Sequence, residues 1–327
     1  MNLRKKVMNK FAIKFTNKVS DFMASYFECI DVSKTYAKGQ TALRSVSFEI
    51  PMHGVFSLIG RNGAGKTTLV RILATELMPT SGKVFIDDID IIREPDSIRR
   101  RIAIIPQEAR AISWLTPMQT VTTFLLYRGI RYSEAKARAK EVLADLGLAS
   151  VADRMNRMLS GGQKRKVLVA ALVASDADIL FMDEPTTGLD PISRSELWDI
   201  LSDLKKEKFI FLTTHYLEEA ERLSDRIGIL DQGEMKAIGT MSDLRSMVPK
   251  KYSISLVDKE NGNIEIENNG SVIKVGSRIF VDENEAYVIA RDLINRNIRF
   301  SINPVSLEDI YYSIAKKEIA GGESVQD

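Results

Sequence analysis

The residues best suited to chemistry in this sequence begin with a glycine-rich stretch whose spacing could hold a phosphate group. Residues 60–67 read Gly-Arg-Asn-Gly-Ala-Gly-Lys-Thr, which is the pattern Gly-x-x-x-x-Gly-Lys-Thr. Glycines let backbone N–H groups turn toward an anion, and a following helix adds the positive end of its dipole. Lys66 would supply a point charge for the outer phosphates, and Thr67 would offer a hydroxyl to Mg²⁺. The alternative is an accidental glycine-rich turn, which the apolar strand pattern at 55–59 and the helical pattern at 69–77 on either side disfavour.

Two neighbouring carboxylates could complete such a site. Asp183 ends an apolar run at 179–182, and Glu184 follows it directly. A carboxylate at the end of a buried strand is costly unless it meets a cation or another partner. The two can divide the work, with Asp183 holding Mg²⁺ and Glu184 accepting a proton from an attacking water or polarising it. From these residues alone, a solvated acidic turn before Pro185 is an equally good interpretation.

These groups need a sheet that brings them to one edge. Strand patterns at 55–59, 178–184 and 209–214 alternate with helical patterns. Such alternation is typical of a parallel sheet with helices on its faces.

Patterns elsewhere in the sequence divide the chain into four parts. Apolar and polar residues alternate in 45–50, as in a half-buried strand, whereas the helical spacing at about 110–165 predicts a helical subdomain. We expect an N-terminal extension at 1–25, a main domain at 26–245, an α+β accessory domain at 250–318 and a tail at 319–327. In the accessory domain we expect strands at 252–257, 264–267, 272–275 and 298–302, a helix at 283–295, and a last helix after Pro304.

Composition excludes several classes of protein. The 327 residues carry 46 Lys and Arg against 44 Asp and Glu, a net charge of +2 that argues against bulk affinity for nucleic acid. The single cysteine, Cys29, excludes a disulfide within the chain and a thiolate zinc cluster, and fits a reducing, cytosolic setting. The longest uncharged apolar run, at 167–175, is far too short to span a bilayer.

A short string between the glycine-rich stretch and the carboxylates suggests a family. Residues 159–163 read Leu-Ser-Gly-Gly-Gln, which resembles the signature motif of the ATP-binding cassette (ABC) family. The resemblance spans roughly 26–245, and three further motifs match in order: a Q-loop at 105–107, a D-loop at 186–190 and a switch histidine, His215. It implies an α/β, P-loop NTPase fold of ABC type: a mixed sheet core, an antiparallel β-subdomain and a helical subdomain, with a small C-terminal α+β domain added.

The resemblance also implies residue roles. Glu184, His215, Gln107 and Lys66 would be catalytic, and Thr67, Gln107 and Asp183 would hold Mg²⁺. ATP would be bound by Tyr36, Gly60, Asn62, Gly63, Ala64, Gly65, Lys66, Thr67 and Thr68. The signature residues Ser160, Gly161, Gly162 and Gln163 would contact the ATP of a partner subunit, and Asp190 would communicate between the two sites.

Two of these residues have plainer interpretations. Tyr36, placed to stack on adenine, could instead be a strand aromatic that fills the sheet. A lone histidine such as His215 is usually a core residue whose hydrogen bonds are satisfied. Its position after Thr213 and Thr214 at a strand end nevertheless favours the functional role.

The family's mechanism implies partners. Two cassettes pack head to tail in the family, so we expect an ATP-dependent homodimer in which the signature of one chain closes over the ATP of the other. The segment after Pro304 resembles the ending of drug- and polysaccharide-exporter cassettes, which implies a separately encoded permease and a cytoplasmic location on the inner face of the cell membrane. The other hypotheses, a soluble ABC ATPase acting on ribosomes or DNA and a cassette that no longer hydrolyses, fit this chain less well. The first class usually has two cassettes, long coiled coils or iron–sulfur cysteines, and the second conflicts with the intact motif residues.

The N-terminal extension has an amphipathic pattern. Lys6, Lys10, Lys14 and Lys18 recur every four residues beside a stripe of apolar side chains. This pattern is typical of a basic helix on an anionic membrane surface. A disordered tail, or translation that starts downstream at Met23, is an equally good interpretation.

Overall fold

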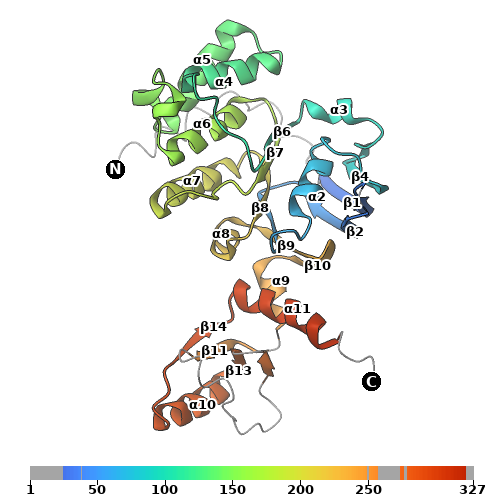
Figure 1. Cartoon of the computed structure of the whole chain (residues 1–327), viewed down its shortest axis with the longest axis vertical. Coiled ribbons are helices and arrows are strands. Elements are labelled where there is room, and N and C mark those ends of the chain that lie inside the picture. Colours follow the sequence, from blue (N-terminus) through green and yellow to red (C-terminus); the bar gives the residue numbers. More distant parts are fainter. Residues whose placement is uncertain (1–24, 38, 249, 257–272, 276–277, 322–327) are drawn as a thin grey trace.

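The computed structural model describes residues 25–37, 39–248, 250–256, 273–275 and 278–321. The predicted N-terminal helix, the strand at 264–267 and the tail beyond 321 lie outside these residues. The described chain forms a larger body with two sheets and a smaller one with a third sheet (Figure 1).

A six-stranded sheet forms the centre of the larger body, in the order β10-β9-β3-β8-β7-β6. All neighbours in it are parallel except β10, which runs antiparallel to β9. Its strands in chain order are β3 (Val55–Ile59), β6 (Ile102–Ile105), β7 (Ile179–Asp183), β8 (Phe209–Thr214), β9 (Arg226–Asp231) and β10 (Glu234–Gly239). The parallel strands expected at 55–59, 178–184 and 209–214 are therefore confirmed.

The central strands are apolar throughout because both faces of the sheet are covered. Phe181 of β7 packs on one side with sheet residues and α2 (Lys66–Leu73). Leu180 and Met182 of the same strand pack on the other side with α6 (Gly161–Ala174) and α7 (Pro191–Leu204). This arrangement brings the carboxyl ends of β3, β7 and β8 to one edge, where the loops that follow them can meet.

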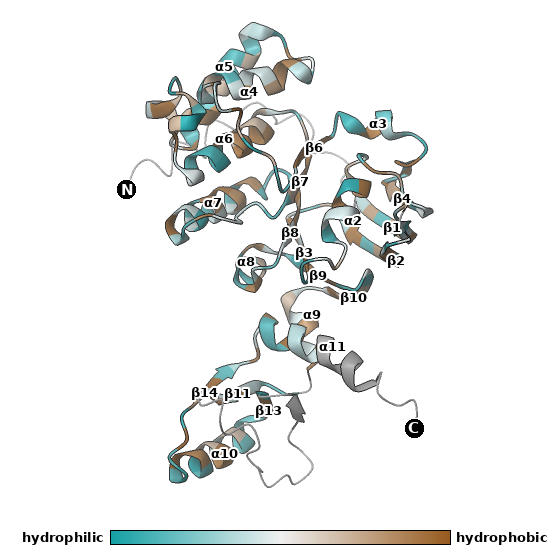
Figure 2. Ribbon diagram, in the orientation of Figure 1, coloured by the Kyte–Doolittle hydropathy of each residue, from teal (hydrophilic) through white to brown (hydrophobic). Residues whose placement is uncertain are grey.

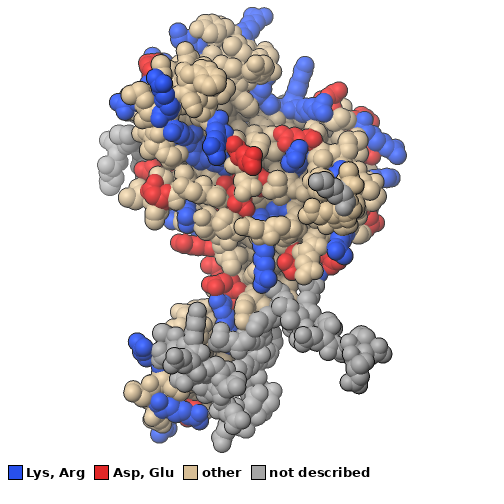
Figure 3. Space-filling model, viewed as in Figure 1, with Lys and Arg blue, Asp and Glu red and all other residues tan. Residues whose placement is uncertain are grey.

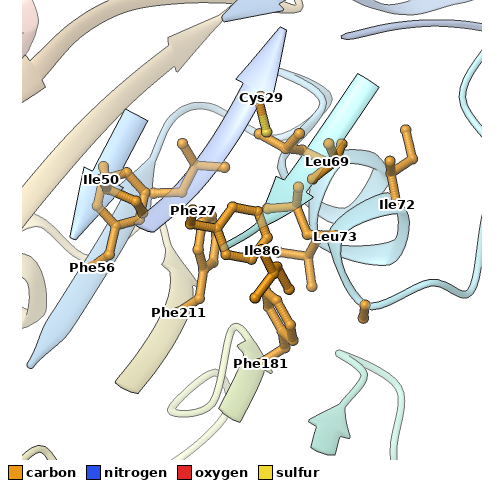
Figure 4. Close-up of a cluster of buried hydrophobic side chains, with 14 of the residues drawn as sticks. Phe27, Cys29, Ile50, Phe56, Leu69, Ile72, Leu73, Ile86, Phe181 and Phe211 are labelled. Carbon is orange, nitrogen blue, oxygen red and sulfur yellow. The ribbon is translucent and has the colours of Figure 1, made fainter. Parts of the chain in front are cut away.

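A second sheet, order β2-β1-β4-β5, is antiparallel and packs over α2. Its strands are β1 (Tyr26–Thr35), β2 (Thr41–Pro51), β4 (Ser81–Ile86) and β5 (Ile89–Asp90). Along β2, Val46, Phe48 and Ile50 are buried and the residues between them are exposed, as their alternation predicts. Phe27 of β1 meets Phe181 edge to face, with ring centroids 6.2 Å apart, and so joins the two sheets (Figure 4).

Helices occupy the region at about 110–165 that was expected to be helical. They are α4 (Pro117–Tyr127), α5 (Tyr132–Asp145) and the start of α6, whereas the short α3 (Pro95–Arg99) lies before β6, outside that region. Thr116 and Gln119 form a capping box at the start of α4, because each side chain accepts a hydrogen bond from the backbone of the other. Buried residues of α4, α5 and α6, the helices at the top of Figure 2, form a separate apolar cluster.

The helix after the glycine-rich loop differs from the expectation of 69–77. It begins three residues earlier, at Lys66, because the loop itself forms the helix start. It ends at Leu73, because Thr75 adopts a left-handed conformation (φ 61°) and the next two backbone N–H groups turn back to the Arg71 carbonyl.

The C-terminal region forms a third sheet, order β12-β13-β11-β14, which is antiparallel. The elements are β11 (Tyr252–Leu256), β12 (Ile273–Val275), β13 (Arg278–Val281), α10 (Glu283–Asn295), β14 (Phe300–Pro304) and α11 (Leu307–Gly321). The helix at 283–295 was predicted with these bounds, whereas the last strand lies two residues beyond the predicted 298–302. Helix α10 packs on this sheet around Ile254 and Leu293.

Two further helices of the described chain are α8 (Leu217–Leu223), after β8, and α9 (Met241–Ser246), after β10. None of the helices in the described residues is both long and apolar enough to cross a bilayer. Basic and acidic side chains are mixed over the face of the larger body drawn in Figure 3.

Candidate functional site

The glycine-rich loop links the end of β3 directly to the start of α2. Gly65 adopts φ 106°, and a Cβ there would lie 2.4 Å from the Ala42 carbonyl oxygen. A Cβ on Gly60 would lie 2.3 Å from the Leu230 carbonyl oxygen. Both positions therefore require glycine, because any side chain would collide with backbone on which the loop rests.

Lys66 is the first residue of α2, and its ammonium group is buried inside the loop. The side chain is 5% exposed, and Nζ donates to the carbonyl oxygens of Gly60 at 2.8 Å and Arg61 at 3.1 Å. Its third neighbour is Glu184 Oε1, 3.8 Å away. Burial lowers the pKa of Lys66, and the charges of Glu184 and then Asp183 oppose that shift. The loop therefore holds a positive charge at the sheet edge.

Glu184 is the point on which several side chains converge. It is 7% exposed, so the solvated acidic turn considered from the sequence is wrong. Three groups lie within hydrogen-bond distance of its Oε2: Thr187 Oγ1 at 3.0 Å, His215 Nδ1 at 3.1 Å and Gln107 Nε2 at 3.3 Å. The backbone of Glu184 is left-handed, with φ 48°, a strained conformation that such sites often contain.

Asp183 is 1% exposed and lies beside Glu184 at the end of β7. Its Oδ1 accepts a hydrogen bond from the hydroxyl of Thr213, which also accepts one from the Glu184 backbone N–H. Its Oδ2 is buried and has no hydrogen-bond partner. A buried carboxylate oxygen without a partner is costly, so the residues present fit a Mg²⁺ ion here. No group of three or more His, Cys, Asp or Glu side chains in the described chain could hold a metal by itself.

Arg165 ties α6 to the backbone that follows these carboxylates. The residue is 9% exposed, and its guanidinium donates to the carbonyl oxygens of Pro185 at 2.6 Å and Glu184 at 3.1 Å. Burial lowers its pKa. The arginine thus fixes the position of the Glu184 backbone relative to the start of α6.

Tyr36 and His215, for which the sequence also allowed a purely structural role, are exposed. Tyr36 lies just beyond β1 and is 37% exposed, so it does not fill the sheet. Its hydroxyl is 3.1 Å from that of Thr68 in α2. The His215 side chain is 33% exposed, so it is not a core histidine. Of the other loop residues, Asn62, Gly63 and Thr67 are exposed, and Ala64 is buried.

The signature residues form the start of α6. Ser160 and Gln163 form a capping box, in which each side chain accepts a hydrogen bond from the other's backbone. Among the polar contacts of the described chain, none joins these two residues to Lys66 or Glu184. Ser160 and Gly161 are exposed. The signature is therefore folded and accessible at the start of α6.

Asp190 caps the helix that packs against the signature. Its carboxylate accepts hydrogen bonds from the backbone of Ile192 at 3.1 Å and from the Ser193 hydroxyl at 2.6 Å. The bonds from Ser193, the side-chain one first, lower the pKa of Asp190. Ser193 also meets the signature, since a Cβ on Gly162 would lie 2.3 Å from its hydroxyl oxygen.

The sequence interpretation missed two residues, Thr187 and Thr213. Both bind the carboxylate pair directly. Each stands in a motif that was recognised, the D-loop and the switch segment, so hydroxyl side chains flanking those motifs were the available signal. A cavity of about 530 Å³ lies elsewhere, between the end of α2 and α4, and is lined by Ala74, Arg99, Ile104, Phe124 and Arg128 among others.

Comparisons with known proteins identify the family. A family model described as ABC transporter matches residues 43–187. The chain is 39% identical over 209 residues to the "Daunorubicin/doxorubicin resistance ATP-binding protein DrrA" of Streptomyces peucetius, covering 64% of this chain and 63% of that protein. It is 37% identical over 217 residues to the "Linearmycin resistance ATP-binding protein LnrL" of Bacillus subtilis strain 168, covering 66% and 70%.

A solved structure is similar as well. The chain superimposes with a TM-score of 0.60 and 29% identity on "Dimeric structure of a post-hydrolysis state of the ATP-binding cassette MJ0796 bound to ADP and Pi", covering 66% of this chain and 98% of that one. The match to the Streptomyces protein spans less than two thirds of its length. The fold class expected from the motifs is confirmed, and the chain belongs to the ABC transporter family.

Proposed function

We propose that this chain binds ATP with Mg²⁺, hydrolyses it to ADP and phosphate, and drives export through a permease encoded separately. The observation that carries the proposal is the convergence of Lys66, Gln107 and His215 on Glu184 at the end of β7. A carboxylate surrounded in this way can polarise a water molecule next to a γ-phosphate held by the loop.

Each residue has a role in that reaction. The water loses a proton toward Glu184 as its oxygen bonds to the γ-phosphorus, and the bond to the β-phosphate oxygen breaks. Lys66 places positive charge at the phosphates, and His215 holds the γ-phosphate and keeps Glu184 in position. A Mg²⁺ ion, when bound, would neutralise phosphate charge, and Asp183, Thr67 and Gln107 are the residues that would hold it.

We propose that the active unit is a head-to-tail homodimer. The first turn of α6 is an exposed helix N-terminus with glycines, suited to an anion. Since none of the described polar contacts joins it to the loop site of its own chain, the ATP it contacts would be the one held by a second copy. The relative whose structure is described as a dimeric cassette supports this assembly.

The proposals about export and about cellular location are based on the similar proteins. Those named above are described as ATP-binding proteins of resistance to daunorubicin, doxorubicin and linearmycin. We propose a cytoplasmic subunit bound peripherally to the inner face of the cell membrane, in which residues 26–245 are the ATPase domain and 250–318 an accessory domain. Affinity purification from native membranes would test this, because a co-purifying protein with several spanning helices is the expected partner.

The Glu184→Gln variant tests hydrolysis and dimerisation together. Glutamine keeps the shape of the side chain but cannot accept the proton, so we expect ATP to bind and remain unhydrolysed. Size-exclusion chromatography with light scattering should then show a dimer with ATP and a monomer without it. Glu141→Gln, an exposed position on α5, is the matched control and should behave as wild type. Rapid turnover by Glu184→Gln would remove Glu184 from the catalytic role.

A further inference from the structure

The last helix, α11, is anchored to the C-terminal sheet by a buried carboxylate. Asp309 is 3% exposed and accepts hydrogen bonds from Ser253 of β11 at 2.9 Å and from Ser306. Arg278 of β13 donates to its other oxygen. Every oxygen of this buried carboxylate is thus satisfied, so α11 and the third sheet are held together at this end of the helix.

The same helix end is also bound to the larger body. The backbone N–H of Leu307, the first residue of α11, donates to Glu221 Oε1 of α8 at 2.6 Å. A carboxylate at a helix N-terminus is favoured by the helix dipole as well as by the hydrogen bond. Helix α8 begins two residues after His215, so this contact acts on the segment that carries the switch histidine.

An apolar cluster extends this contact toward the phosphate loop. Leu307 and Ile310 of α11 share one buried cluster with Ala220 of α8 and with Ile59. Ile59 is the last residue of β3, directly before Gly60 of the loop. Figure 1 shows α11 crossing between the two bodies beside α9.

One side chain of α11 packs beside the start of the phosphate loop. Tyr311 packs against the apolar cluster that contains Ile59, and its buried hydroxyl has no hydrogen-bond partner. Burial raises the pKa of Tyr311, the charge of Asp231 adds to this, and Arg61 opposes it. Gly60 and Arg61, which follow Ile59 directly, supply the two carbonyl oxygens that hold the Lys66 ammonium. A shift of α11 would therefore reach Lys66 through the start of this loop.

We propose that α11 is a positioning element of the nucleotide site: Tyr311 packs where the phosphate loop begins, next to Ile59, and Glu221 ties the helix to the switch segment. The inference rests on the proposed function and extends it, because it gives the accessory domain a part in setting the site. Anything that moves the third sheet would act on ATP binding through Tyr311 and on hydrolysis through Glu221. The alternative is that α11 only covers apolar surface of the larger body.

Two variants of the full chain separate these roles. Tyr311→Ala removes the ring that packs on the Ile59 cluster, and we expect the Kd of a fluorescent ATP analogue to rise about three- to tenfold with kcat nearly unchanged. Glu221→Ala removes the link to α8, and we expect kcat to fall about three- to tenfold, whereas Glu221→Gln, which keeps an acceptor, should retain most of it. Matched controls are Tyr287→Ala, at a tyrosine 76% exposed on α10, and Glu218→Ala, at an exposed position of α8.

The outcomes are distinguishable. Unchanged Kd in Tyr311→Ala together with unchanged kcat in Glu221→Ala would overturn the proposal, as would losses that only follow a lower Tm or that the controls reproduce. If only one of the two variants shows its expected change, the contact that this variant tests is supported and the role of the other contact is overturned. Failure of the wild-type chain to bind the analogue would contradict the proposed function itself, and this inference with it.

Discussion

The starts of α2 and α6 are both glycine-containing helix N-termini, but they are built differently. At α2 the N-cap is the left-handed Gly65, with no side-chain cap, and Lys66 is 5% exposed inside the loop. At α6 the Ser160 capping box occupies the helix start, and the first residues are exposed. The first end is thus a nearly enclosed site within one chain, whereas the second is a finished surface. The difference fits the proposed dimer, in which a ligand would enter at α2 and α6 would close over one held by a second copy.

The largest expected effect is at the enclosed end. Lys66→Ala removes the buried charge that the loop carbonyls and Glu184 surround, so we expect kcat/KM for ATP to fall by about 100-fold or more. Steady-state phosphate release measures this, with Lys140→Ala, at an exposed position of α5, as control. ATP turnover by Lys66→Ala at the wild-type rate would show that hydrolysis takes place at a site other than this loop.

The exposed end should behave differently. Ser160→Arg puts a bulky side chain on the surface of α6, and we expect kcat to fall about tenfold or more while the Kd of the isolated monomer for ATP is unchanged. Equilibrium binding at low protein concentration, beside turnover, checks this. Weaker ATP binding by the monomer would mean that the two ends already act together within one chain.

The two signature glycines give a smaller, paired effect on stability. Gly162→Ala places a Cβ 2.3 Å from the Ser193 hydroxyl, and we expect a loss of about 1–3 kcal/mol. Gly161→Ala meets nothing within 4 Å and should be neutral or stabilise the helix by up to about 1 kcal/mol. Chemical denaturation of both variants measures the difference, and equal effects would contradict the packing of α6 on α7.

The smallest effect concerns a buried carboxylate behind the switch segment. Glu219 of α8 is fully buried, and its Oε1 accepts a hydrogen bond from Trp198 Nε1 at 3.0 Å. Burial raises its pKa in spite of its polar neighbours. The folded state therefore binds its proton more tightly than the unfolded chain, and stability falls as pH rises from the unfolded pKa toward the folded one. Glu219→Gln should gain stability relative to wild type as the pH rises above the pKa that Glu219 has in the unfolded chain, measured by denaturation at a series of pH values. A difference independent of pH would show that Glu219 folds in its charged form.

Local sequence patterns predicted those strands and helices whose form depends on residues close together in the chain. The alternation in β2, the continuous apolar strands β3, β7 and β8, and the bounds of α10 follow from periodicity along a short segment. The β9–β10 hairpin was missed, although its turn carries the signal: Gln232 and Gly233 both adopt positive φ between two apolar runs, as a tight hairpin turn requires.

Convergence across the chain was harder to predict. Motif resemblance named Gln107, Glu184 and His215, but it could not show that they meet at one oxygen, because they lie up to 108 positions apart and the distance depends on the strand order. The contact of α11 with the phosphate loop is of the same kind. In the sequence its residues have the pattern of an ordinary amphipathic helix, and only packing shows that Tyr311 lies against the cluster of Ile59, directly before the loop.

A mixing experiment tests the central claim, that one triphosphate is held by two chains, most directly. Lys66→Ala lacks a working loop but keeps its signature, and Ser160→Arg has the reverse defect. Each variant alone should be inactive. If the site is shared between copies, each heterodimer contains one intact site, formed by the loop of Ser160→Arg and the signature of Lys66→Ala, and ATPase activity reappears. If each chain forms its own site, the mixture is as inactive as its parts, and the account is wrong.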